Sequence, residues 1–473
     1  MFDDEVAARI RDDRERDGFL FPHYGRYCFA GVPATLGGVL GVDLPGDPLP
    51  DGAVADVPGL AGTAPGDDAG YDRVCHVLVD GFGYEQWRRE VAADRAPEWL
   101  ADLAETARVT PLTSVYPSET AAAITTVHTG RTPAEHGVIG WDVYHPDADR
   151  VVQTLPFTAK SGDPADEAYG VDAGDLFAGG SIYDTLADAG VDSVTVQPTK
   201  AATGAYSAHA LAGADSRGYE DLDGFRSLLT EAMAESAPGT YCYAYLSDVD
   251  GAAHAAGTDS DRYRETLAAV SEAVATALSG VPDEVAESTL LVVTADHGHV
   301  DTDPETNVDL WEHDFLTERM RRYETGAPAG YPLAGGDGGD GGDAGDDGHG
   351  GDAGNGEHGG DAAGDPLPPV GGARNVHLHL RPGMTEEVVD YLDRTFDGRA
   401  FTREEAFDRG LFGNRAVSDR LRRRCGDVVF VHRQRAVWRG DEPGKLGYVG
   451  WHGGLTSAEM LTPFAAAPLS DVV

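Results

Sequence analysis

Short apolar runs that alternate with helical segments constrain the fold of this 473-residue chain most strongly. Segments with helical periodicity, such as residues 262–278, separate these runs. Four runs have the length and composition of buried strands: residues 74–79, 193–196, 241–246 and 289–294. Such strands pair in parallel, because a helix carries the chain back to the start of the next strand. The sequence therefore predicts an α/β fold, with a mostly parallel central sheet and helices on both faces.

Composition divides the chain further. Residues 334–365 are almost entirely glycine, aspartate and alanine, so they cannot bury a core. Beyond them, residues 375–380 and 428–432 have the pattern of strands and 385–396 that of a helix. We expect five parts: an N-terminal extension packing on the core (1–70), the α/β core (71–333), an acidic disordered loop (334–371), a small α+β insertion (372–437) and a return to the core (438–473).

The chain is strongly acidic along its whole length. Its 81 acidic and 36 basic residues give a net charge of −45, and only three of the basic residues are lysines. A lysine-poor, acidic surface suits a protein in very high salt, where charge repulsion is screened within about 3 Å at 1 M. We therefore expect a halophilic cytoplasmic protein. The same charge argues against a nucleic-acid duplex as a partner, because phosphate backbones are bound by clustered Lys and Arg.

The sequence predicts no signal peptide, no membrane span and no cysteine motif. The first 18 residues are charged throughout and lack the pattern of a signal peptide. No apolar stretch near them is long and unbroken enough to span a bilayer, so no membrane partner is expected. The four cysteines form no CxxC pair, which indicates neither a zinc knuckle nor a disulfide framework.

Several metal-ligating and nucleophilic side chains follow predicted strands or begin a predicted helix. They are Asp80, Thr120 before the helix at 121–129, Asp250 with His254, Asp296 with His297, and His452. Each alone has an ordinary explanation as a turn residue, a helix cap or a surface pair. Together they converge, because the carboxyl ends of parallel strands meet at one edge of the sheet. Mixed nitrogen and oxygen ligands suit two divalent ions such as zinc. A hydroxyl at a helix N-terminus lies where the free N–H groups favour a phosphate.

This ordered set resembles the alkaline phosphatase superfamily and, within it, the type I phosphodiesterase/nucleotide pyrophosphatase family. The resemblance rests on Tyr116-Pro117, Thr120, Thr129-Gly130 and Pro133-Ala-Glu-His136-Gly137, at the family spacing. It implies a three-layer sandwich and two divalent ions, zinc first and manganese as the alternative. One ion would be held by Asp250, His254 and His452, and the other by Asp80, Asp296, His297 and Thr120.

The resemblance also implies a reaction. Thr120 would attack phosphorus, and water would then hydrolyse a phosphoryl-threonine intermediate. We expect a hydrolase of phosphodiester or pyrophosphate bonds in small molecules, with Ser118 as the next candidate nucleophile. His299 is interpreted as a surface histidine, with a role behind the metal ligands as the alternative. The insertion is a candidate cap over the site.

Two departures from the family pattern bear on the substrate. Ala121 follows Thr120 where nucleotide-specific members carry an aromatic residue, and Trp141 replaces an asparagine that binds phosphate. Trp141 is therefore a candidate substrate-binding residue, and specificity for nucleotides is in doubt. The absence of a Cys/Ser-x-Pro-x-Arg segment at the nucleophile excludes a sulfatase. A phosphomonoesterase, a phosphopentomutase-like phosphotransferase and a non-catalytic phosphate or metal binder stay as alternatives.

Overall fold

The structure is a computed structural model of the chain. It describes residues 1–473 except 55–56, 58–69, 310–311, 325–363, 434–437 and 440–446. The predicted disordered loop at 334–371 therefore lies mostly outside the described residues. No helix in the described part of the chain is long and apolar enough to cross a membrane.

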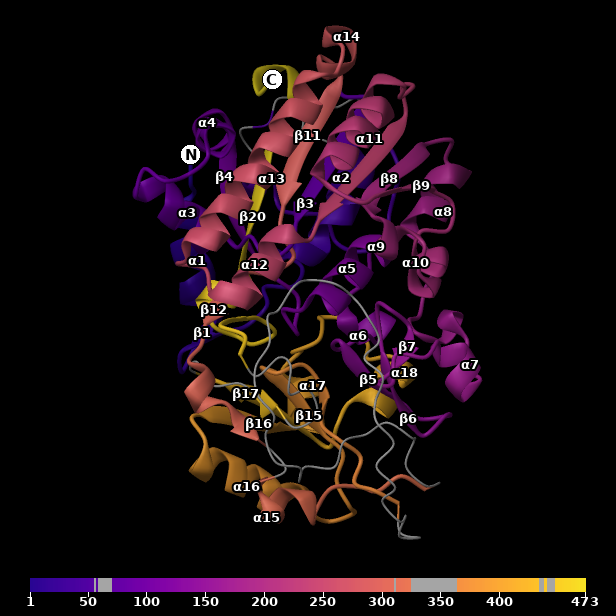
Figure 1. Cartoon of the computed structure of the whole chain (residues 1–473), viewed down its shortest axis with the longest axis vertical. Helices are drawn as coiled ribbons and strands as arrows, with labels where there is room; N and C mark the ends of the chain where they lie inside the picture. Colours follow the sequence, from indigo (N-terminus) through magenta and orange to yellow (C-terminus); the bar gives the residue numbers. More distant parts are fainter. Residues whose placement is uncertain (55–56, 58–69, 310–311, 325–363, 434–437, 440–446) are drawn as a thin grey trace, which may run out of the picture.

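A seven-stranded sheet forms the centre of the larger half of the molecule (Figure 1). Its strands, in spatial order, are β4 (Arg108–Thr113), β20 (Leu461–Pro468), β11 (Thr289–Thr294), β3 (Arg73–Val79), β10 (Thr240–Leu246), β8 (Asp192–Pro198) and β9 (Asp215–Tyr219). All run parallel except β20, which is antiparallel to both its neighbours. The predicted parallel α/β sheet is confirmed. β3 and β11 are buried at every position, because helices cover both faces.

Two sets of helices pack around this sheet. On the face toward the viewer in Figure 1, α13 contacts its neighbours α4, α11 and α12, whose bounds are α4 (Glu98–Thr106), α11 (Leu222–Ala234), α12 (Asp248–Ala256) and α13 (Asp261–Ser279). The second set comprises α2 (Val32–Val39), α5 (Thr120–Thr129) and α8 (Ile182–Asp188), with α5 in contact with the other two. The predicted helices at 121–129 and 262–278 correspond to α5 and α13.

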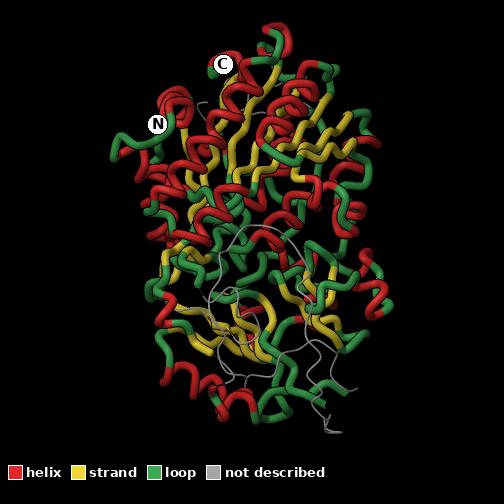
Figure 2. The backbone as a smooth tube through the Cα atoms, viewed as in Figure 1, coloured by secondary structure: helices red, strands yellow, loops and turns green. Residues whose placement is uncertain are grey.

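A second sheet of seven strands, antiparallel throughout, forms the other half of the molecule (Figure 2). Its spatial order is β16 (Gly398–Thr402), β17 (Val428–His432), β15 (Asn375–Leu378), β14 (Val370–Gly371), β5 (Asp142–His145), β6 (Arg150–Gln153) and β7 (Thr158–Ala159). Helix α16 (Thr385–Thr395) packs its apolar face on β16 and β17. The structure differs from the expected division here, because residues 142–159, expected in the core, join the insertion through the β14–β5 pairing.

The N-terminal segment lies against both halves. α1 (Asp4–Arg14) contacts β4, and Val6 and Ile10 join the main apolar core. The short strands β1 (Glu15–Arg16) and β2 (Phe19–Leu20) form a hairpin after it. The backbone N–H of Leu20 donates to the Leu455 carbonyl at 2.7 Å, which ties this hairpin to the C-terminal segment.

A buried ion pair joins the second sheet to the C-terminal part of the main sheet. Arg374, just before β15, pairs with Glu459 in α19 (Ser457–Met460) at 2.5 Å, and both side chains are fully buried. Glu459 also accepts a hydrogen bond from the Gly454 backbone N–H at 2.9 Å. The carboxylate therefore fixes the loop that follows His452.

Candidate active site

The ends of β3 and β11 bring two carboxylates and a histidine together. Because β3 and β11 pair in parallel, with Leu78 opposite Thr294, the residues that follow them lie side by side. His297 Nε2 is 3.4 Å from Asp80 Oδ1 and 3.4 Å from Asp296 Oδ2. All three side chains are at most 3% exposed. We call Asp80, Asp296 and His297 the carboxylate-rich group.

A second group gathers around Asp250. Asp250 and His254 lie one turn apart on α12, so they share a face of that helix. The pairing of β12 (Val300–Asp301) with β19 (Gly450–Trp451) brings together His299, just before β12, and His452, just after β19. Asp250 Oδ1 lies 3.0 Å from His299 Nε2, 3.4 Å from His254 Nε2 and 3.7 Å from His452 Nε2. We call Asp250, His254, His299 and His452 the histidine-rich group.

His299 corrects the sequence interpretation. It was expected at the surface, but its side chain is fully buried against Asp250. A Cβ on Gly81 would lie 2.4 Å from the ring of His299, and Gly81 has a φ of +69°. Only glycine fits there, so the Asp-Gly turn after β3 makes room for this ring. The usable signal was the spacing of His297 and His299, two residues apart across Gly298.

The four histidines share one orientation. In each, Nδ1 faces a backbone carbonyl oxygen, and the pairs are His254 with Gly450 (2.7 Å), His297 with Gly298 (3.2 Å), His299 with Gly81 (3.2 Å) and His452 with Ser118 (3.2 Å). A carbonyl oxygen can only accept, so the proton is on Nδ1. The lone pair of each Nε2 is therefore left to face the centre of the site, as metal-binding histidines require.

The carboxylates show the same division between a fixed and an unpaired oxygen. Asp296 Oδ1 accepts hydrogen bonds from the backbone N–H groups of Gly81 (3.1 Å) and His297 (3.0 Å), and Asp80 Oδ2 accepts one from the Tyr245 hydroxyl. The other oxygens, Asp80 Oδ1, Asp250 Oδ1 and Asp296 Oδ2, are buried and have no hydrogen-bond partner among the described residues. Buried polar atoms are nearly always paired, so three orphans in one place indicate a ligand.

The spacing of these atoms fits metal ligation. Tetrahedral ligands at 2.0–2.1 Å from zinc lie about 3.3 Å from one another. The separations of 3.0–3.7 Å within the two groups are close to that value. Asp250 Oδ1 and His299 Nε2 are 3.0 Å apart, a separation that also allows both atoms to bind one ion. The residues present therefore fit two divalent cations.

Thr120 lies beside the carboxylate-rich group. It is the first residue of α5, and its Oγ1 is 3.1 Å from His297 Nε2. Ser118, the alternative nucleophile, is fully buried, donates to the Gly454 carbonyl at 2.8 Å and accepts from the Gly453 N–H at 3.2 Å. Its hydroxyl is committed to the loop after His452, so the geometry favours Thr120.

Trp141 lies near the nucleophile but belongs to neither group. Its backbone N–H donates to Glu119 Oε2 at 3.0 Å, and Glu119 immediately precedes Thr120. The indole is 36% exposed, which is unusual for so large an apolar side chain. Its role in substrate binding stays a prediction.

A mostly parallel sheet, two groups of residues that could hold cations and a hydroxyl at a helix N-terminus together define an α/β enzyme of the alkaline phosphatase superfamily. The sequence model of the type I phosphodiesterase/nucleotide pyrophosphatase family matches residues 74–454, so the chain belongs to this family. It is a phosphoric ester hydrolase. The resemblance noted from the sequence is thereby confirmed.

Solved structures show the same fold. Murine ectonucleotide pyrophosphatase/phosphodiesterase 5 is 15% identical with a TM-score of 0.57, over 84% of this chain and 88% of its own. An inactive variant of that enzyme in complex with AMP is also similar, at 14% identity, a TM-score of 0.56 and the same coverage. Phosphonoacetate hydrolase from Sinorhizobium meliloti 1021, in complex with phosphonoformate, is 17% identical with a TM-score of 0.54, over 83% of this chain and 89% of its own. No curated protein sequence matches the chain.

Proposed function

We propose that the chain is a two-metal hydrolase of phosphodiester or pyrophosphate bonds, with Thr120 as its nucleophile. The observation that carries the proposal is the position of Thr120 Oγ1, 3.1 Å from His297 Nε2 and at the start of a ten-residue helix. A protein that only bound phosphate would need the helix N-terminus but no hydroxyl directed at the carboxylate-rich group.

We propose a separate role for each of the two groups. The carboxylate-rich group with Thr120 would hold one ion, and the histidine-rich group the other. Bound zinc or manganese supplies Lewis acidity, which stabilises an alkoxide and a departing oxygen. Thr120 Oγ forms a bond to phosphorus as the bond to the leaving oxygen breaks, which gives a phosphoryl-threonine. The first-turn N–H groups of α5 stabilise the phosphoryl oxygens. Water then attacks phosphorus and restores the threonine.

The composition bears on the conditions in which the enzyme works. We propose that the enzyme works in the cytoplasm at high salt, because its 81 acidic residues are spread along the chain and only three of its 36 basic residues are lysines. A small anionic phosphoester then reaches the site because the salt screens the negative surface. The second sheet is connected to the loop after His452 through the Arg374–Glu459 ion pair. This connection supports the proposal that the second sheet helps to cover the substrate.

Substrate preference is tested with three compounds in molar KCl. We expect bis-(p-nitrophenyl) phosphate to be hydrolysed faster than p-nitrophenyl phosphate, and both activities to be lost with a chelator and restored by zinc or manganese. Phosphonoacetate is the third compound, because a protein of the same fold hydrolyses it. A strong preference for the monoester would move the function to a phosphatase, and turnover in the presence of chelator would refute the two-metal mechanism.

The nucleophile is tested with Thr120→Ala and Ser118→Ala. We expect Thr120→Ala to lose on the order of 10⁴-fold in kcat while it still folds and binds metal. Ser118→Ala should keep most of its kcat, since that hydroxyl bonds to backbone atoms of the Gly453–Gly454 loop. Mass spectrometry of acid-quenched enzyme should find the phosphoryl group on Thr120. An active Thr120→Ala variant would show that the nucleophile is wrong.

A further inference from the structure

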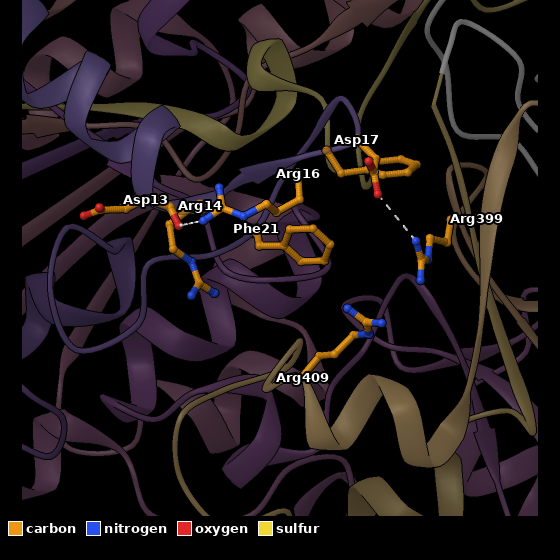
Figure 3. Close-up of a pocket in the computed structure, with 8 residues that line it drawn as sticks. Asp13, Arg14, Arg16, Asp17, Phe21, Arg399 and Arg409 are labelled. Carbon is orange, nitrogen blue, oxygen red and sulfur yellow. Dashed lines mark hydrogen bonds and ion pairs between the residues drawn. The ribbon is translucent and has the colours of Figure 1, made fainter.

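A pocket lined by arginines lies apart from the active site, where the N-terminal segment meets the second sheet (Figure 3). Its volume is about 220 Å³. Two arginines come from the end of α1 and from β1, and two from β16 and the end of α17 (Arg403–Asp408): Arg14, Arg16, Arg399 and Arg409. None of them belongs to the two cation-binding groups.

The charge of this pocket is opposite to that of the protein as a whole. Its four arginines face only two lining carboxylates, whereas the chain has 81 acidic and 36 basic residues. Asp17 Oδ2 lies 3.7 Å from Arg399 Nη1, but the Asp17 side chain is 71% exposed. Asp13 instead lies 3.9 Å from His23 Nε2. The carboxylates therefore do not neutralise the pocket.

Three of the arginines, Arg14, Arg16 and Arg409, make no ion pair with a carboxylate among the residues that the structure describes, whereas Arg399 pairs with Asp17. Arg14 Nε is buried and lacks a hydrogen-bond partner. The guanidinium of Arg409 contacts the Phe401 ring, 5.8 Å from its centroid, and makes no ion pair with a described residue. Arg16 differs, because it donates to the backbone carbonyls of its own turn. The charge of Arg409 is therefore not neutralised by a described carboxylate, and an anion in the pocket would offset it.

Aromatic rings support these guanidinium groups. Phe21 lines the pocket and meets Phe401 edge to face, with ring centroids 6.5 Å apart. Arg399 also lies by the Phe401 ring, 5.3 Å from its centroid. In Figure 3 the guanidinium groups of Arg399 and Arg409 point toward one another across the pocket. Contact with a ring uses the face of a guanidinium and leaves its N–H donors for another partner.

We propose that this pocket binds an oxyanion of the phosphate class, either inorganic phosphate or the phosphate group of a nucleoside monophosphate. Planar guanidinium groups match the geometry of phosphate oxygens and bind them with paired hydrogen bonds. Two facing guanidinium groups repel one another, and an anion between them removes that repulsion. The site is independent of the metal centre and of the function proposed for it.

The test measures phosphate binding to the metal-free protein by isothermal titration calorimetry at fixed KCl concentration. The test variant is Arg399→Gln/Arg409→Gln. Arg423→Gln is the matched control, since Arg423 is also exposed but pairs with Asp147 elsewhere on the surface. Asp296→Asn is the second control, because it removes a negative charge from the active site and so changes the phosphate affinity only if the anion binds there. We expect one phosphate per chain, unchanged affinity in both controls and at least about tenfold weaker binding in the double variant.

A second titration with AMP distinguishes the two sources of phosphate. Tighter binding of AMP than of phosphate, lost with Phe21→Ala, would identify a nucleotide as the ligand, and equal binding would identify free phosphate. Circular dichroism and the melting temperature show whether each variant is folded. If the double variant is unfolded, the single variant Arg409→Gln replaces it, because Arg409 is exposed. Failure of the wild-type protein to bind phosphate, or equal binding by a folded Arg409 variant, would overturn the proposal.

Discussion

The two candidate cation-binding groups are built differently. The carboxylate-rich group follows directly from two paired parallel strands, and its side chains are at most 3% exposed. The histidine-rich group is assembled from a helix, the short strand β12 and the C-terminal segment, and Asp250, His254 and His452 are 14–18% exposed. One group is part of the core, and the other borders the solvent.

Their charges also differ. Burial raises the pKa of Asp80 well above its ordinary value, and the negative charges of Asp296 and Asp250 raise it further. At Asp250 burial also acts upward, but the neighbouring histidines His254 and His299 outweigh it and lower the pKa. The carboxylate-rich group has two carboxylates and the histidine-rich group only one, so the first has more negative charge for a bound cation to offset. We therefore expect the buried group to bind an ion more firmly than the histidine-rich group does.

Removing one carboxylate from the buried group is expected to have the largest effect. Asp296→Asn should lose on the order of 10³-fold or more in kcat, because the ion beside Thr120 is lost. Metal analysis should find about one ion per chain instead of about two. Asp301→Asn is the matched control, since Asp301 lies on β12 but only accepts from the Thr258 N–H at 2.8 Å. Two ions in Asp296→Asn would refute the assignment of that group.

The order of metal loss tests the difference in exposure. We expect a chelator to remove metal from the wild-type protein in two phases, with the histidine-rich group losing its ion first because it is open to solvent. In His254→Gln the fast phase should be absent and the slow phase unchanged. A single phase in the wild-type protein would contradict the distinction between the groups.

Replacement of His299 is expected to have a smaller effect than replacement of Asp296. His299→Gln should weaken metal binding at the histidine-rich group about 10–100-fold, as the loss of a ligand or of a residue that positions one does. The spectrum of the cobalt-substituted protein should change as well, which distinguishes this role from general destabilisation. His209→Gln is the control, because His209 lies by Phe177 and outside both groups. An unchanged spectrum and affinity would return His299 to a structural role.

The convergence of Asp80 and Asp296 could be predicted because the relevant signals are local. Asp80 and Asp296 each end an apolar run, and the polarity of a parallel sheet then places them at one edge. His299 was misplaced because its position depends on the β12–β19 pairing across about 150 residues, and on the space above Gly81. Neither can be read from the sequence around His299.

The second sheet shows the same limit at a larger scale. The strands at 375–378 and 428–432 and helix α16 were recognised from their own patterns. The participation of β5–β7 was not, because it depends on the pairing of Gly371 with Asp142, far apart in the sequence. Strand order in an antiparallel sheet is decided by which apolar faces meet, and that information is spread over the whole chain.

Buried histidines outside the two groups should give the protein a steep acid dependence. Burial lowers the pKa of His76 in β3 to about 3 and that of His377 in β15 to about 3, since neither has a carboxylate beside it. The unfolded chain binds their protons near pH 6.5, so the free energy of unfolding is full above that pH and falls as the pH drops toward 3. Each contributes about 1.4 kcal/mol per pH unit in this window.

Denaturant unfolding between pH 7 and 5 measures this slope. His76→Gln should flatten it by about 1 kcal/mol per pH unit on average over this range, because one of the protons taken up on unfolding is removed. His313→Gln is the control, since His313 is half-buried and bonds to the Tyr391 hydroxyl at 3.1 Å. Equal slopes in all three proteins would show that His76 is already protonated in the folded state.

Substitution of Trp141 should have the smallest effect on activity, because Trp141 belongs to neither group. Its backbone is connected to the nucleophile through Glu119, and its side chain, which is exposed, would offer a ring face to a substrate. Trp141→Ala should raise KM by about three- to tenfold and leave kcat nearly unchanged, because an aromatic contact contributes about 0.5–1.5 kcal/mol. Trp141→Phe should keep most of that affinity if the ring face binds substrate. If Phe is as weak as Ala, the indole N–H is the group that matters, and it takes the place of the amide that nucleotide-specific relatives are expected to use.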